Sequence, residues 1–199
     1  IVHDFLTERE CEQMLNYTLP RMGPSVVVGG GTSSWRQSQS VNMYPDYDDE
    51  TNFVTTVARR KFAFARQVAG YSDVVENEGQ EPVNAVYYRH YGDHYGAHCD
   101  GECRGGSYHR GGRIATSLTY CKVAEKGAYT LFTRSGIKMV PKPRQMLFFG
   151  YKFEPNSSRM DNGGTEHSGC PLRSGEKWIA TMWYREGVTP EKDWSKFGV

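Results

Sequence analysis

The chain has 199 residues, of which 38% are hydrophobic and 24% are charged, which predicts one folded domain with a single core. Lysine and arginine number 24 against 23 aspartate and glutamate residues, and the two signs are interspersed, so no nucleic-acid partner is expected. No apolar run approaches the roughly 18 residues that cross a bilayer, so no membrane-spanning segment is expected.

The first predicted helix is FLTERECEQMLNYTL, residues 5–19. Thr7 and Glu10 have the spacing of a capping box, in which each side chain bonds the backbone amide of the other residue. Apolar residues then recur at helical spacing until Pro20, which ends the pattern.

A second helix is predicted in NFVTTVARRKFAFARQVAG, residues 52–70, where Gly70 closes the segment. Its apolar stripe would be formed by Phe53, Val57, Phe64 and Val68. Residues 25–52 hold three consecutive glycines and several serines. That composition predicts a long loop with one short strand at most.

From Glu81 onward the hydrophobic period changes from helical to two. Segments rich in β-branched and aromatic residues alternate with Gly, Pro, Lys and Asp clusters, which indicates antiparallel strands. The segments are NAVYYR, RIATSLTYC, GAYTLFT, QMLFFG and KWIATMWY. The fold class is therefore α+β and mainly β: a sandwich or jelly roll over about 81–187, with the helices of about 1–80 packed on one sheet.

A metal site is indicated by His98 and Asp100 in YGAHCD. On a strand, alternate side chains point the same way, so this imidazole and carboxylate can converge on one divalent transition metal. Such a pair is common by chance and needs a third ligand. His167, in a Gly-rich turn of GGTEHSGCP, is the candidate that would complete a facial triad of two histidines and one carboxylate.

Lys177 lies on the same face of the last strand as two bulky hydrophobic residues, Ile179 and Trp183. One interpretation is an edge-strand lysine whose ammonium reaches water. The other is a buried cation that pairs with the carboxylate of a ligand. Its position ten residues after His167 favours the second interpretation.

Together these motifs resemble the 2-oxoglutarate and Fe(II)-dependent oxygenases, and within them the prolyl 4-hydroxylase catalytic domain. The resembling segments follow one another along nearly the whole chain: FLTEREC, EPVNAVYY, YGAHCD, RIATSLTY, GAYTLF, MLFFG and EHSGCPLRSGEKWIATMWYREG. The resemblance implies a double-stranded β-helix (jelly roll) core in a single catalytic domain over residues 1–199. The chain departs from the family pattern at Ala97, where the family has proline, and at Ala128, where it has glycine.

The resemblance also assigns roles to residues. It makes His98, Asp100 and His167 the ligands of Fe(II), and Lys177 the partner of the distal carboxylate of 2-oxoglutarate. Further members of the co-substrate pocket would be Tyr88, Thr130, Thr181 and Trp183. Contacts to the substrate peptide would come from Tyr95 and Arg113.

The activity implied by the resemblance is hydroxylation of peptidyl proline to 4-hydroxyproline, with O2 as co-substrate, release of succinate and CO2, and ascorbate as reductant. The partner would be a proline-containing polypeptide. Two other classes stay open: the same chemistry on a lysyl, arginyl or small-molecule target, and a non-catalytic jelly-roll binding module. A halogenase is disfavoured because Asp100 would occupy the position that halide needs.

Substrate capture is expected to involve Gly-rich segments and aromatic side chains. Residues 26–40 and 101–112 are candidate lids, because flexible segments that order on binding exclude water. A groove for a polyproline II peptide could be formed by aromatic residues that equally fit the rim of a core. These are Trp35, Tyr87, Tyr88, Tyr91, Tyr95 and Tyr108.

The cysteine count and two glycosylation sequons bear on the compartment. Five cysteines are an odd number, and Cys99 and Cys103 fit a disulfide or free thiols better than a zinc site. The sequons begin at Asn16 and Asn156 and favour the secretory pathway, in the endoplasmic reticulum or Golgi lumen. The chain begins at Ile1 without methionine, so we expect a segment of a longer protein.

Overall fold

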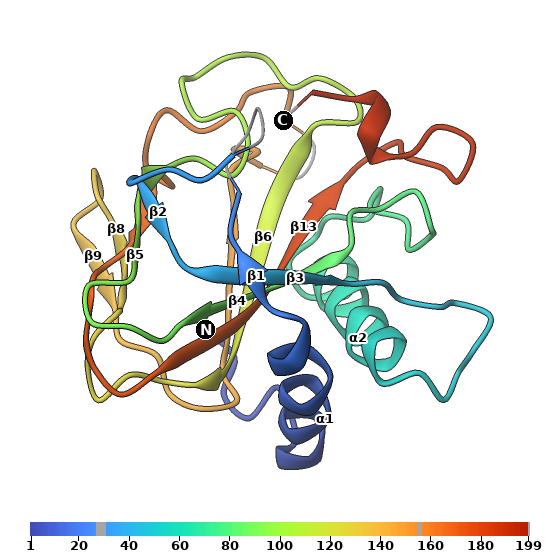
Figure 1. Ribbon diagram of the computed structural model, residues 1–199. Helices are drawn as coiled ribbons and strands as arrows, with labels where there is room; N and C mark the ends of the chain where they lie inside the picture. Colours follow the sequence, from blue (N-terminus) through green and yellow to red (C-terminus); the bar gives the residue numbers. More distant parts are fainter. Residues whose placement is uncertain (27–30, 155–156, 199) are drawn as a thin grey trace.

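The computed structural model describes residues 1–26, 31–154 and 157–198 (Figure 1). Helix α1 spans Glu8–Thr18, and the reciprocal hydrogen bonds of Thr7 and Glu10 confirm the predicted capping box. Helix α2 spans Phe53–Gln67 and begins at Asn52, whose side-chain oxygen accepts hydrogen bonds from two amides of the first turn. Short 3₁₀ turns follow at Leu19–Arg21 (η1) and Trp194–Lys196 (η2).

The apolar stripe expected on α2 is only partly correct. Val57 is buried, but Val68 is 70% exposed because it follows the last turn as the C-cap residue. The face that packs on the sheet is instead formed by a set that includes small and polar residues: Val54, Thr55, Val57, Ala58, Lys61, Phe62 and Ala65.

Antiparallel sheets make up most of the rest of the molecule, as the period-two segments predicted. The larger sheet has the order β1-β3-β4-β13-β6-β10, with bounds Gly23–Pro24, Gln39–Met43, Val83–Tyr88, Lys177–Arg185, Arg113–Lys122 and Met146–Gly150. The smaller sheet has the order β2-β5-β11-β8-β9, with bounds Arg36–Gln37, His94–His98, His167–Gly169, Thr130–Phe132 and Ile137–Met139. A separate pair joins β12 (Leu172–Ser174) to β7 (Lys126–Gly127).

Strands β1, β2 and β3 lie in or next to the segment 25–52 that was expected to be a loop with one short strand at most. That expectation was wrong for β2 and β3, which both form there. In β3 only Met43 is fully buried, so its sequence shows no alternation of apolar and polar residues that would predict a strand. The strand forms because it pairs with β4. Residues 27–30 of the candidate lid and the sequon residue Asn156 lie outside the described residues.

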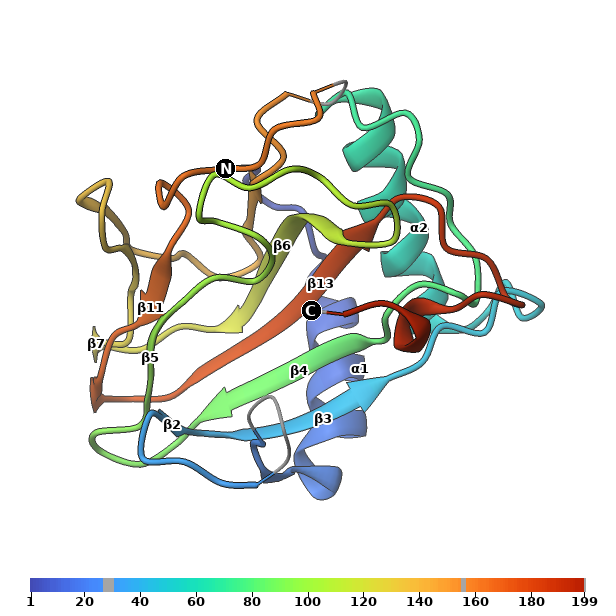
Figure 2. The ribbon, with the colours of Figure 1, turned by 90° about the horizontal axis from the view of Figure 1, so that it is seen from above.

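Both helices cover one face of the larger sheet, as predicted (Figure 2). Along β13, Trp178, Ala180, Met182 and Tyr184 pack into the core beneath the helices. Ile179 belongs to a second apolar cluster, which joins the opposite face of the larger sheet to β8 and β9 of the smaller one. The alternation along β13 therefore places Lys177, Thr181 and Trp183 on the side away from the helices, where the candidate site lies.

Two disulfides join four of the five cysteines, and Cys170 is free. Cys11 of α1 is bonded to Cys121 of β6, and Cys99 is bonded to Cys103 in the loop after β5. The second bond selects one of the two alternatives open from the sequence. None of the helices within the described ranges is long and apolar enough to cross a membrane.

Candidate metal and co-substrate site

His98, Asp100 and His167 come together where β5 and β11 pair. His98 is the last residue of β5 and lies opposite His167, the first residue of β11. Asp100 follows in the loop after β5, so the expectation that His98 and Asp100 share a strand was wrong, as was the placement of His167 in a turn. One potential ligand atom from each residue lies within 4.8 Å of the other two.

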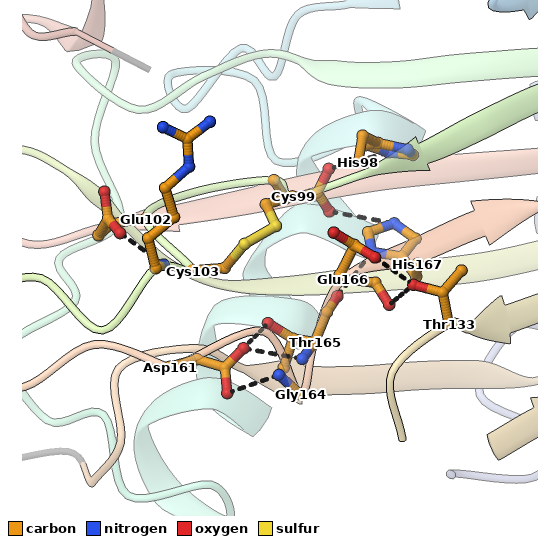
Figure 3. Close-up of a disulfide and its surroundings, with 12 residues drawn as sticks. His98, Cys99, Glu102, Cys103, Thr133, Asp161, Gly164, Thr165, Glu166 and His167 are labelled. Atoms are coloured by element: carbon orange, nitrogen blue, oxygen red, sulfur yellow. Dashed lines mark hydrogen bonds and ion pairs between the residues drawn. A yellow bond between two sulfur atoms is a disulfide. The ribbon is translucent and has the colours of Figure 1, made fainter. Parts of the chain in front are cut away.

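His98 and His167 lie among the residues that surround the bond between Cys99 and Cys103 (Figure 3). His98 Nε2 lies 3.5 Å from Asp100 Oδ1, and His167 Nε2 lies 3.7 Å from Asp100 Oδ2. The Nδ1 atoms of the two rings lie 2.8 and 3.0 Å from the carbonyl oxygens of Gly96 and Thr165. A carbonyl can only accept a hydrogen bond, so each Nδ1 carries the proton and each Nε2 keeps a lone pair for a metal.

The protonation states fit the same role. Burial lowers the pKa of His167 to about 4, so the imidazole is neutral at pH 7. Burial alone would raise the pKa of Asp100, but the neighbouring His167, His98 and Arg113 hold it well below its usual range. The hydroxyl of Thr116 donates to Asp100 Oδ2 at 2.7 Å and orients it. Two imidazoles and one carboxylate are a donor set for a divalent transition metal such as Fe(II).

A cavity of about 410 Å³ adjoins the three ligands. It is lined by all ten residues that the resemblance assigned to the metal, the co-substrate or the substrate peptide: His98, Asp100, His167, Lys177, Tyr88, Thr130, Thr181, Trp183, Tyr95 and Arg113. They come from both sheets, so strand pairing brings together side chains that are far apart in the sequence. Of the other aromatic residues expected to form a groove, Trp35, Tyr87, Tyr91 and Tyr108 do not line the cavity.

Lys177 is the cation of this cavity. It is 1% exposed on the central strand β13, which rules out the interpretation of an edge lysine reaching water. Its Nζ atom lies 5.0 Å from the ring centre of Tyr88 and 5.9 Å from that of Tyr120. Across the described ranges no carboxylate forms an ion pair with it.

Burial lowers the pKa of Lys177 to about 8, so most of its ammonium groups are charged at neutral pH. A buried cation without a counter-ion is unfavourable, and an anionic ligand relieves that penalty. Burial also raises the pKa of Tyr88 to about 12, which keeps its hydroxyl protonated and able to donate. The cavity therefore suits a ligand with one end on the metal and a carboxylate on Lys177.

Two residues that support the site, Arg36 and Tyr120, were not indicated by the sequence. Arg36 lies over the ring of Tyr95 at 4.6 Å, and Tyr95 stacks on His98 with ring centres 3.6 Å apart. Tyr120 contacts Thr130 through their hydroxyl oxygens, 3.2 Å apart. These are ordinary polar or aromatic residues whose roles exist only after the strands have paired.

The sequence model described as the 2OG-Fe(II) oxygenase superfamily, where 2OG is 2-oxoglutarate, matches residues 83–185. The chain belongs to this superfamily. The match runs from β4 to the end of β13 and so contains every one of the ten cavity residues.

Named relatives of this oxygenase match it over most of its length. Prolyl 4-hydroxylase 5 of Arabidopsis thaliana is 27% identical, with 92% of this chain and 67% of the relative covered. The mouse prolyl 4-hydroxylase subunit alpha-3 is 26% identical, with 94% and 33% covered. A crystal structure of a viral collagen prolyl hydroxylase from Paramecium bursaria Chlorella virus 1, in complex with 2-oxoglutarate, superimposes with a TM-score of 0.71, 25% identity and coverage of 94% and 93%.

Proposed function

We propose that this oxygenase is a prolyl 4-hydroxylase catalytic domain that converts peptidyl proline to 4-hydroxyproline. One observation carries the proposal. The buried Lys177, which has no ion-pair partner among the described residues, lines the same cavity as two histidines and one carboxylate that could bind a metal. The names of the relatives, which match more than nine-tenths of the chain, support proline as the target. We further propose that residues 1–199 are one domain and that the two larger sheets form its double-stranded β-helix.

The cofactors follow from the donor sets. His98, Asp100 and His167 would hold Fe(II), and Lys177 would hold 2-oxoglutarate with help from Tyr88, Thr130, Thr181 and Trp183. The bound iron and co-substrate supply oxidative decarboxylation to succinate and CO2, together with transfer of one oxygen atom from O2 to a C–H bond. Ascorbate would be the reductant.

The chain itself positions the ligand residues and the substrate. Tyr95 stacks on His98, and Thr116 orients Asp100, so the ligand set is held before any substrate arrives. A second cavity, of about 810 Å³, shares His98, Cys99 and Arg113 with the first. It would receive the peptide, with Tyr95 and Arg113 at the junction where the target proline meets the metal.

The two disulfides support a compartment that is oxidising, because such bonds persist in secreted and lumenal proteins and are rare in the cytosol. We therefore propose the lumen of the endoplasmic reticulum or Golgi as the site of action.

The test is succinate release by protein loaded anaerobically with Fe(II) and then given 2-oxoglutarate, O2 and a peptide. A proline-rich peptide should stimulate succinate release and gain the mass of one oxygen atom, whereas the same peptide with alanine for proline should do neither. His167→Ala should be silent, and His90→Ala, which changes an exposed histidine outside the ligand set, should retain activity. Turnover that no proline peptide stimulates would contradict the proposed target.

A further inference from the structure

One wall of the larger cavity, of about 810 Å³, is rich in arginine. It is formed by the loop after β5, by the segment after β8 and by the C-terminal residues around Phe197. Besides the partly buried Arg113, three exposed arginines line it: Arg104, Arg110 and Arg134. Within the part of the chain that the structure describes, none of the three forms an ion pair with a carboxylate.

Two carboxylates line this cavity, and each accepts a hydrogen bond from an uncharged group. Glu102 Oε1 accepts one from the backbone amide of Arg104 at 2.6 Å. Glu166 Oε1 accepts one from the hydroxyl of Thr133 at 2.5 Å (Figure 3). Among the described residues neither carboxylate forms an ion pair with a guanidinium of the wall, so these guanidinium groups can pair with a carboxylate of a ligand.

Below the wall a buried cluster adds positive charge. Arg113, which lines the cavity, and Arg185, which is fully buried, both bond the single carboxylate of Glu81. Arg185 Nη2 is buried and has no hydrogen-bond partner among the described residues. Two guanidinium groups thus share the carboxylate of Glu81 beneath the cavity. The exposed arginines also outnumber the two carboxylates that line it, so the charge around the cavity is positive on balance and attracts anionic ligands.

Two of the wall arginines pack against glycines. A Cβ atom added to Gly187 would overlap the side chain of Arg110, and one added to Gly163 would overlap the guanidinium of Arg134. The absence of a side chain at each glycine thus gives the neighbouring arginine the space that it occupies beside the cavity.

We propose that this cavity selects peptides in which an acidic residue lies close to the target proline, with Arg104, Arg110 and Arg134 as the recognition residues. The inference rests on the proposed function and deepens it. A cavity of this volume is roughly 9 Å across, which is about three residues of a polyproline II peptide. The acidic side chain is therefore expected within about three residues of the proline.

The experiment uses blocked peptides with one target proline and otherwise neutral residues. Each series has one variable position, which holds glutamate, glutamine or lysine. This position lies two residues before the proline in the first series and two residues after it in the second. For the Fe(II)-loaded enzyme, kcat/KM for the glutamate peptide of at least one series should exceed that of the glutamine peptide roughly tenfold, the factor of one charge-assisted hydrogen bond. The lysine peptide should be poorer still, and high salt should reduce both differences.

The double variant Arg110→Gln, Arg134→Gln should reduce the ratio of the glutamate to the glutamine peptide to near one. Arg66→Gln, which changes an exposed arginine of α2, should leave that ratio unchanged. Equal hydroxylation of all three peptides in both series would overturn the charge selection while the proposed function stood. Absence of an added oxygen on every peptide would overturn the proposed function, and the selection with it.

Discussion

Arg113 binds both carboxylate oxygens of Glu81, with its Nε and Nη2 atoms 2.6 and 2.5 Å from them. Its remaining nitrogen, Nη1, donates to the carbonyl oxygen of Asp100 at 2.9 Å, and its guanidinium lies 3.9 Å from the ring of Trp183. The same carboxylate accepts from Arg185 at 2.6 Å. One buried acid therefore connects the end of β13 to the backbone of Asp100, a proposed metal ligand.

Glu81→Gln should destabilise the fold strongly. It leaves Arg113 and Arg185 buried without a counter-charge, and breaking a buried ion pair from one side costs on the order of 3 to 5 kcal/mol. Because Arg113 also holds the Asp100 carbonyl, the affinity for metal should fall in the variant that remains folded at low temperature. Urea unfolding and a metal titration measure the two effects.

The matched control is Glu176→Gln. Glu176 also bonds two side chains, Lys122 and Tyr87, but about a third of its side chain is exposed to water. Its loss should cost under about 1 kcal/mol, as for other exposed pairs. Equal destabilisation by the two variants would show that the Glu81 cluster is no more than a surface pair.

Local spacing pointed to two pairs of site residues: Asp100 follows His98 by two positions, and Lys177 follows His167 by ten. Joining the two pairs into one site needed the resemblance, because His167 lies 69 positions after His98. Strands with one buried face were also predictable, since alternate burial leaves a period of two. Strand β5 was not, because all five of its residues are half-buried and show no alternation. Glu81 could not be predicted either, because its partners lie 32 and 104 residues away and meet it only in the folded sheet.

Lys61 should make stability depend on pH. Its ammonium is fully buried on α2, with one hydrogen bond to the carbonyl of Ala180 at 3.1 Å, and burial lowers its pKa to about 7. In the unfolded chain the pKa is about 10.4, so between these values the unfolded state binds more protons. The contribution of Lys61 to stability should therefore rise with pH from about 7 to about 10.4 and stay constant above that, where both states are deprotonated.

The measurement compares urea unfolding of the native protein and Lys61→Met at pH 7 and pH 9. Each pH unit in this window is worth about 1.4 kcal/mol for a group protonated only in the unfolded state. The native protein should therefore gain roughly 2 kcal/mol relative to Lys61→Met between the two pH values. A constant difference would mean that the ammonium is solvated in the folded state.

Lys177→Met should affect binding and stability in opposite directions. Without the ammonium, the distal carboxylate of 2-oxoglutarate has no counter-charge, so affinity should fall by about 100-fold. The free protein should become more stable, because a buried cation has been replaced by an apolar side chain of similar length. Calorimetric titration of 2-oxoglutarate into metal-loaded protein and thermal unfolding of the free protein measure the two.

Lys122→Met is the control for that variant. Lys122 lies on β6, pairs with Glu176 and is about one-third exposed. Its loss should leave affinity for 2-oxoglutarate unchanged and should not raise stability. If Lys177→Met lowered stability instead, the lysine would have a structural role and the carboxylate-binding role would be unsupported.

The two disulfides should separate stability from metal binding. The bond between Cys11 and Cys121 closes a loop of 110 residues and fastens α1 to the sheet, so Cys11→Ala, Cys121→Ala should lower the free energy of unfolding by about 2 to 4 kcal/mol. The bond between Cys99 and Cys103 closes a loop of four residues, so its chain-entropy effect is smaller, but that loop contains Asp100. Of the two double variants, Cys99→Ala, Cys103→Ala should therefore cause the larger loss of metal affinity, and Cys11→Ala, Cys121→Ala the larger drop in melting temperature. If one double variant caused the larger loss in both measurements, a positioning role for the small loop would be contradicted.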